Sequence, residues 1–200
     1  MMKYGATETT NNLIIDDQNS QDSSTWSKYW LLDSPLEGVM LVSVILNSMA
    51  AGIIFIFSNT IMPSLATLDS DIGINIMNKI NVIIVNPLFI VAFFGGLVSV
   101  YPTVKMFYNP NEYCKPARYY AVASTLIFFF GEFIVTGTQN VPRNNALLVV
   151  DPESEDGVHY WKNDFLKGWV AWNTFRGINA AISAVLGGLS LCFMRKPLVV

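Results

Sequence analysis

Long apolar runs separated by short polar segments make up most of this sequence. Four of the runs are almost free of charge, and the helices expected within them cover residues 36–57, 81–104, 118–140 and 170–194. A helix needs about 20 apolar residues to cross about 30 Å of hydrocarbon, so each run is long enough to span a membrane. A buried core helix would explain one such run but not all four. We therefore predict an all-α fold, an integral membrane four-helix bundle in contact with the lipid bilayer.

Two amphipathic helices are expected on the non-cytoplasmic side of the bundle, between the spans. Residues 69–81, after a break at Met62-Pro63-Ser64-Leu65, repeat isoleucine at helical spacing, and residues 160–173 repeat aromatic side chains in the same way. We expect both helices to lead directly into the spans that follow them. The two apolar faces consist of Ile72, Ile76 and Ile80 in the first helix and of Trp161, Phe165, Trp169 and Trp172 in the second.

The N-terminal part of the chain differs in composition from the rest. Residues 1–34 are polar and acidic, and such a segment cannot bury enough apolar surface to offset the entropy lost on ordering. We predict a disordered tail over residues 1–34 and a four-span domain over residues 35–196. Trp26 and Trp30, near the end of the tail, fit the aromatic belt found at membrane–water interfaces.

The overall composition supports the membrane prediction and excludes several classes of function. The sequence is 52% hydrophobic and 14% charged, whereas about 25% of the residues of a soluble domain are charged. Its 12 basic residues form no stripe that could bind nucleic acid. With one histidine, two cysteines and no nucleotide-binding loop or nucleophile motif, the chain is expected to hold no metal and no cofactor.

The charges of the short connections predict the orientation of the bundle. Lys105, Lys115 and Arg118 lie between the second and third spans, and Arg195 and Lys196 follow the fourth. The connection after the third span instead carries four acidic residues between positions 151 and 156. Because basic residues are enriched in cytoplasmic loops, we expect both termini of this multi-pass protein to face the cytoplasm.

Polar side chains inside the spans gather toward the non-cytoplasmic end. Such groups are costly in hydrocarbon, so they normally face the bundle interior and often mark a functional site. The helical rise puts Glu132 and Arg176 at similar depths, close enough for an ion pair. Two interpretations stay open: hydrogen bonds that hold the helices together, or a polar pocket for a small molecule. The candidate site residues are Asn47, Asn81, Glu132, Asn140, Trp169, Trp172, Asn173 and Arg176.

Two sequence elements resemble a known family of small four-span membrane proteins. Residues 140–147 read NVPRNNAL and residues 169–176 read WVAWNTFR. Residues 62–65 (MPSL) and 80–89 (INVIIVNPLF) agree with the same family. In this order the elements are similar to those of the anthrone-oxygenase-like proteins, and the resemblance covers about residues 36–195.

The resemblance implies a specific chemistry. Some members are assigned as anthrone oxygenases, which convert an anthrone to an anthraquinone with O₂ and without a bound cofactor. By the resemblance, Glu132 would be the base that removes a proton, helped by donors to the enolate oxygen and by side chains that bind the aromatic ring. The donors would be Arg176, Asn173 and Asn140, and the binding side chains would be Trp172, Trp169, Asn81 and Asn47.

Two positions depart from the family pattern. Arg143 stands where an apolar residue is common, and Thr174 stands where a histidine often follows the Trp-Asn pair. The second change removes a candidate base, so whether the chain is an enzyme stays open. The alternative is a non-enzymatic membrane subunit or small-molecule binder, with a small aromatic ligand, an oligomer or a membrane complex as its partner. A transporter is less favoured, because the chain has no detectable internal repeat.

Overall fold

The computed structural model describes residues 34–194, and this part of the chain is helical, without β-strands. The predicted tail therefore lies outside the described residues, apart from Ser34, as do residues 195 and 196 of the predicted domain. The elements, in chain order, are α2 (Pro35–Ile56), η1 (Phe57–Ile61), α3 (Met62–Leu65), α4 (Ser70–Ile83), α5 (Pro87–Phe94), η2 (Gly95–Ser99), α6 (Val100–Tyr108), α7 (Lys115–Phe128), η3 (Phe129–Ile134), η4 (Thr136–Asn140), α8 (Val141–Val149), α9 (Glu155–His159), η5 (Tyr160–Phe165) and α10 (Leu166–Met194).

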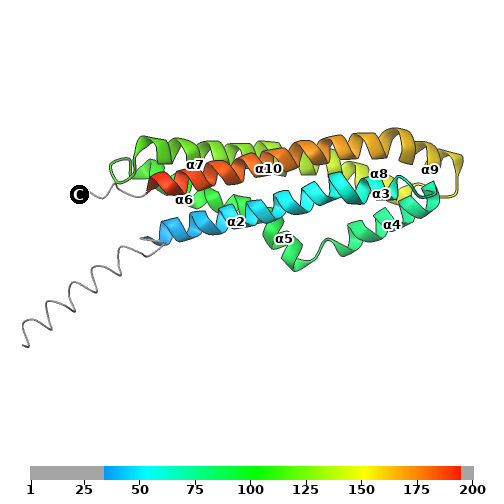
Figure 1. The fold of residues 1–200 in the computed structure, drawn as a ribbon, viewed down its shortest axis with the longest axis horizontal. Helices are drawn as coiled ribbons and strands as arrows, with labels where there is room; N and C mark the ends of the chain where they lie inside the picture. The colour runs from blue at the N-terminus through cyan, green and yellow to red at the C-terminus, as the bar shows by residue number, and fades with distance from the viewer. Residues whose placement is uncertain (1–33, 195–200) are drawn as a thin grey trace, which may run out of the picture. The chain divides into compact units, whose positions relative to one another are not determined.

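Within the described residues, four helical stretches are long and apolar enough to cross a membrane: Pro35–Leu65, Pro87–Tyr108, Lys115–Val149 and Glu155–Met194. They confirm the prediction of an all-α, multi-pass membrane bundle. Many large apolar side chains are exposed along these stretches, where lipid would cover them. Figure 1 shows α7 and α10 side by side, and this pair forms the most extensive helix contact of the bundle.

The first and third spans each contain a proline that follows a π-helical turn and does not break the helix. The first span was expected to break at Met62-Pro63-Ser64-Leu65, but it continues through α3 to Leu65. A proline lacks the backbone N–H, and its ring crowds the preceding helical turn. The turn before Pro63 is π-helical (η1), and so is the turn before Pro142 (η4). Because local π-helical geometry can accommodate a proline, both helices continue past it.

The second span is separated from the amphipathic helix before it. Helix α4 ends at Ile83 and α5 begins at Pro87, so the segment 84–86 forms an elbow between them. The side chain of Asn86 accepts a hydrogen bond from the Phe89 N–H and donates to the carbonyl oxygens of Ile83 and Ile84. The prediction that α4 leads directly into the span is therefore wrong. The corresponding prediction for residues 160–173 is confirmed, because η5 continues into α10 without a break.

Helix α4 packs against α8, α9 and η5 at one end of the bundle. It buries Ile74 and Met77 in the same cluster as Trp161 and Phe165. Of the three isoleucines expected on one face, Ile76 and Ile80 pack at the edge of this cluster, whereas Ile72 is exposed. The buried face of α4 is thus rotated from the predicted one. The full cluster consists of Met62, Leu65, Ile74, Met77, Leu147, Trp161, Phe165 and Trp169.

Small residues allow α2 to approach its neighbours closely. A Cβ at Gly96 of η2 would overlap Oδ1 of Asn47 and the ring of Phe128, and a Cβ at Gly187 of α10 would lie 2.8 Å from Val44. Close approach of this kind is the usual way in which helices pack inside membranes. Asn47 also donates a hydrogen bond of 2.9 Å to the hydroxyl of Ser183, which ties α2 to α10.

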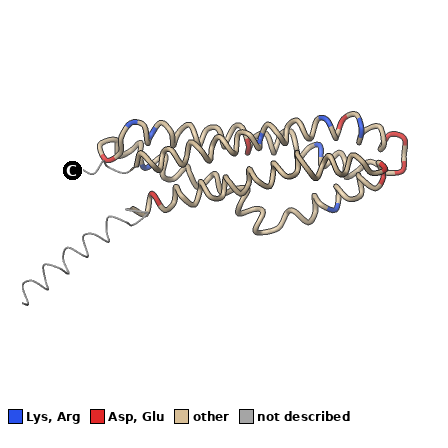
Figure 2. The backbone as a smooth tube through the Cα atoms, viewed as in Figure 1, with Lys and Arg blue, Asp and Glu red and all other residues tan. Residues whose placement is uncertain are grey.

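Charged residues are concentrated toward the two ends of the bundle, and its middle is nearly free of them, as Figure 2 shows. Glu132 of η3 and Arg176 of α10 are buried charged side chains within the third and fourth spans. Since a buried charge in a membrane span is costly and often marks a functional site, the region between η3 and α10 is a candidate site.

Candidate functional site

A cavity of about 270 Å³ lies between α2, the elbow with its flanking helices, η4–α8 and α10. Its walls are mainly aliphatic and aromatic, and its polar lining comes from Asn81, Thr136, Asn140, Asn144 and Arg176. The apolar lining consists of Ile53, Ile54, Phe57, Ile80, Ile84, Val85, Phe89, Ile90, Phe93, Phe94, Val141 and Trp169. Four of the candidate residues, Asn81, Asn140, Trp169 and Arg176, therefore meet at one cavity.

Arg176 brings a guanidinium group to this cavity while remaining 8% exposed. Its Nε and Nη2 donate to Oδ1 of Asn173 at 3.0 and 2.6 Å, and its Nη1 donates to Oγ1 of Thr136 at 2.9 Å. The guanidinium carbon also lies 5.9 Å from the centre of the Trp169 ring, within the range of a cation–π contact. The groups in direct contact with the positive charge of Arg176 are thus an uncharged amide, a hydroxyl and an aromatic ring.

Asn173 supports Arg176 and does not line the cavity itself. While its Oδ1 accepts from Arg176, its Nδ2 donates to the Ile54 carbonyl oxygen at 2.9 Å and to the Ser58 hydroxyl at 2.7 Å. Both ends of the amide are therefore occupied, and the residue links α10 to the first span. This geometry makes Asn173 a positioning residue for the guanidinium.

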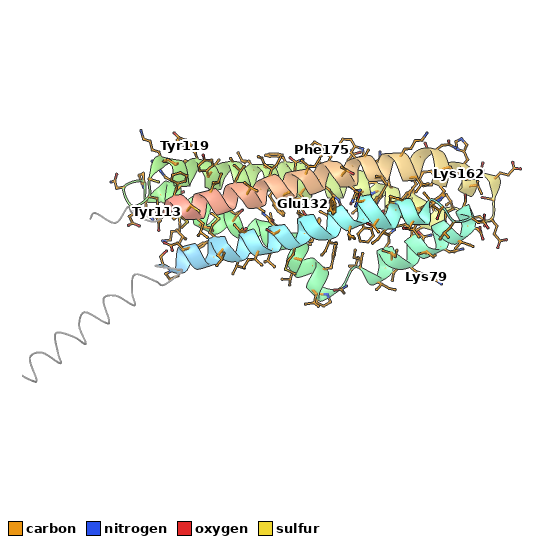
Figure 3. All side chains as sticks on the ribbon, in the orientation of Figure 1. Lys79, Tyr113, Tyr119, Glu132, Lys162 and Phe175 are labelled. Carbon is orange, nitrogen blue, oxygen red and sulfur yellow. The ribbon has the colours of Figure 1, made fainter. Side chains whose placement is uncertain are left out.

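Glu132 is fully buried, and neither of its carboxyl oxygens has a hydrogen-bond partner among the described residues. Figure 3 shows it in the middle of the bundle. It interacts electrostatically with Arg176, but no ion pair within 4.0 Å joins the two in the described chain. Thr136, which accepts from Arg176, donates to the Glu132 carbonyl oxygen at 2.8 Å. Glu132 does not line the cavity itself, and its neighbours Thr136 and Arg176 do.

Two buried amides of the cavity wall keep an unused hydrogen-bonding atom. Asn140 donates to the Trp169 carbonyl oxygen at 3.3 Å, but its Oδ1 has no partner in the described part of the chain. The Nδ2 atom of Asn81 is likewise buried and without a partner there. Since buried polar groups are normally hydrogen-bonded, these two atoms are exceptions among the described residues that line the cavity. The Trp169 indole N–H is already bound to Oδ1 of Asn144 at 2.7 Å.

Asn47 and Trp172, the remaining candidate residues, lie away from the cavity. Asn47 is buried between α2 and α10, where it binds Ser183, and Trp172 packs edge-on against Phe175 with ring centres 5.9 Å apart. Thr174 does not reach the cavity either, because its hydroxyl donates to Ser58 on an exposed face. A histidine at position 174 would therefore not line this cavity.

Comparison with protein families identifies the family of this chain. A family model described as anthrone oxygenase matches residues 77–186, which is more than half of the 200-residue chain. The chain belongs to the anthrone oxygenase family. No curated protein and no solved structure gives a significant match to it.

The part of the chain shared with the anthrone oxygenase family contains most of the site. It includes Asn81, Thr136, Asn140, Trp169 and Arg176, together with the elbow. The wall contributed by the first span lies outside the matched residues. In residues 34–194, no group of three His, Cys, Asp or Glu side chains could hold a metal ion.

Several lining residues were not identified from the sequence. Thr136 and Asn144 provide hydrogen bonds at the wall, and the elbow residues Ile84 and Val85 form one side of the cavity. Thr136 is one of the polar side chains of the third span, but it was not among the candidate site residues. Ile84 and Val85 carried no such signal, because they stand in an uninterrupted apolar run.

Proposed function

We propose that this protein is a cofactor-independent oxygenase that acts on an anthrone-like aromatic ketone in the cavity beside Arg176. The observation that carries the proposal is a buried guanidinium at the wall of an otherwise largely apolar, aromatic-lined cavity. The volume of about 270 Å³ lies just below the range of about 300–1,000 Å³ typical of small-molecule sites, which suits a compact ring system.

The reaction requires removal of a proton and transfer of electrons to O₂. Loss of a proton from the CH₂ group opposite the ketone, which is conjugated with the carbonyl through the aromatic rings, gives an enolate, whose oxygen would be stabilised by Arg176. The enolate carbon donates an electron to O₂, and the two radicals combine to form a C–O bond and a peroxide. Protonation of the peroxide gives a hydroperoxide. Loss of the second proton from the same carbon, with cleavage of the O–O bond and departure of water, leaves a second carbonyl group. The balance is one anthrone and one O₂ to one anthraquinone and one water.

The other polar groups have separate roles in this proposal. Asn81 and Asn140 line the cavity, and a rotation of their side chains would bring the free Nδ2 of Asn81 to a ligand oxygen and the free Oδ1 of Asn140 to a ligand hydroxyl. Glu132 would receive the proton through water, because it does not line the cavity itself. Asn173 would keep the Arg176 guanidinium directed at the enolate oxygen.

The Glu132→Gln variant tests the proposed proton transfer. Glutamine keeps the size of the side chain but cannot accept the proton, so we expect the rate of anthrone oxidation to fall about 100-fold. The measurement is anthraquinone formation by purified protein in detergent, corrected for oxidation without protein. Glu112→Gln, in an exposed connection, is the matched control and should keep the wild-type rate. A wild-type rate equal to that without protein would remove the oxygenase function, and a fully active Glu132→Gln would remove the proposed base.

A non-enzymatic binder is the second candidate function. It is favoured by one observation: no carboxylate, histidine or thiol lines the cavity, so the ligand meets Arg176 as its one ionisable neighbour within the described residues. In that case the protein would bind an anthraquinone-like ligand without accelerating the oxidation of an anthrone. The same oxidation assay, combined with a binding measurement, separates the two functions.

For the orientation, we propose that the connection between the second and third spans faces the cytoplasm, as its basic residues predict. Cys114 lies in this connection and is exposed. A membrane-impermeant maleimide should therefore label Cys114 only after intact cells expressing the protein are permeabilised, and a Cys114→Ser variant corrects for labelling elsewhere. Labelling of Cys114 in intact cells would reverse the orientation.

A further inference from the structure

The cavity is polar on its buried side and apolar where it reaches the surface. Asn140 and Arg176 are 1% and 8% exposed, whereas Val85, Phe94, Val141 and Ile90 are 65%, 42%, 42% and 41% exposed. All four exposed lining residues are thus apolar. We call these four residues the mouth of the cavity. A mouth without polar residues is unsuited to contact with water.

The location of the mouth places it against lipid. Ile90 and Phe94 belong to the second span and Val141 to the third, and Val85 lies in the elbow just before the second span. Neighbouring side chains around the elbow are also apolar and strongly exposed, among them Val82, Ile83 and Leu88. An exposed apolar surface of this kind on a membrane bundle is one that acyl chains cover.

The backbone of the elbow is compatible with this position. A chain break at membrane depth would expose polar backbone groups, which are costly without water. Asn86 satisfies several of them locally, because it caps α5 through the Phe89 N–H and binds the carbonyl oxygens of Ile83 and Ile84. The elbow can therefore border an opening to lipid without hydrogen bonds from the rest of the bundle.

We propose that the ligand reaches Arg176 laterally from the bilayer, through the mouth formed by Val85, Ile90, Phe94 and Val141. This inference rests on the proposed function, and it restricts the ligands to flat, uncharged, membrane-dissolved ring systems. Ile90 and Val141 set the width of the opening from the second and third spans. Phe94 borders it and packs edge-on against Phe133, with ring centres 5.6 Å apart.

The rate of ligand uptake tests this route without requiring turnover. The protein is reconstituted in phosphatidylcholine vesicles and mixed with vesicles that contain 9,10-anthraquinone, whose binding is followed by quenching of Trp169 fluorescence. The Trp169→Phe variant supplies the background from the other tryptophans. Ile90→Phe and Val141→Phe narrow the mouth and should slow association about tenfold while leaving the final quenching near wild type.

Matched controls come from the same two helices. Val91→Phe in α5 and Leu148→Phe in α8 add the same ring at exposed positions that do not line the cavity, and both should keep the wild-type rate. Ile90→Ala widens the mouth and should speed association, so the test does not depend on the bulky variants folding. Wild-type rates in all three mouth variants would overturn the lateral route alone. A wild-type protein in which anthraquinone causes no quenching would overturn both this route and the proposed function.

Discussion

Replacement of Arg176 by alanine should lower kcat/KM for anthrone oxidation about 1,000-fold, the upper end for loss of a single oxyanion donor. The change removes a positive charge from a cavity whose other polar lining groups are neutral. It also leaves Oδ1 of Asn173 without the two donors that it binds in the structure. Anthraquinone formation under air, again corrected for oxidation without protein, gives the comparison.

Arg143→Ala provides the matched control for this prediction. Arg143 lies in the neighbouring α8 and donates to the backbone and side chain of Gln139, but it does not line the cavity. Its replacement should leave kcat/KM unchanged. Arg176→Gln keeps a donor for Asn173 without the charge, so it should fold and still lose most of the activity. An Arg176→Gln protein with the wild-type rate would exclude Arg176 from the reaction.

The Gly96→Ala variant should lose about 3 kcal/mol of unfolding free energy, which is severe for one added methyl group. The new Cβ would overlap Oδ1 of Asn47 and the ring of Phe128. Neither neighbour can move aside easily, because Asn47 is bound to Ser183 and Phe128 is fully buried. Unfolding of the purified protein in mixed micelles with increasing denaturing detergent measures the loss.

A glycine of the fourth span gives the corresponding control. Gly188 has no atom within 4 Å of the position that its Cβ would take. Gly188→Ala should therefore change the unfolding free energy by less than about 0.5 kcal/mol. If Gly96→Ala and Gly188→Ala proved equally stable, the close approach of α2 and η2 at Gly96 would be refuted.

The spans were predictable because a membrane span is a continuous run of apolar residues, which can be read directly from the sequence. The elbow was not, since the run from Ile80 to Val104 contains no charge. Asn86 and Pro87 could be read either as part of a span or as a helix boundary. The side chain of Asn86 decided in favour of the boundary by capping α5. The separation of α4 from α5 depends on the packing of α4 against α8, α9 and η5. The sequence does not show this packing.

The residues of the site were partly predictable for a related reason. Helical rise places Glu132 and Arg176 at similar depths, but it does not determine the direction in which either side chain points. In the structure Arg176 binds Asn173 and Thr136, while Glu132 does not line the cavity. For the same reason the sequence could not predict that Asn47 binds Ser183 or that Trp172 packs against Phe175, away from the cavity.

The π-helical turns could not be predicted from a helix drawn with a constant period of 3.6 residues. Among the described residues they occur at Phe57–Ile61, Phe129–Ile134, Thr136–Asn140 and Tyr160–Phe165. Each such turn accommodates one residue more than an α-helical turn. Residues on opposite sides of a π-helical turn therefore do not share the stripe that a period of 3.6 assigns to them.

These wide turns make the site sensitive to chain length as well as to residue type. Deleting one residue from such a turn would make it α-helical and leave the helices on either side near their present orientation. The change would fall on the side chains of the turn itself, among them the cavity residues Phe57, Thr136 and Asn140. Natural family members that differ by a single-residue insertion or deletion in these turns would then present different side chains to the cavity. In an alignment of such proteins, the gaps would carry as much information about the ligand as the substitutions.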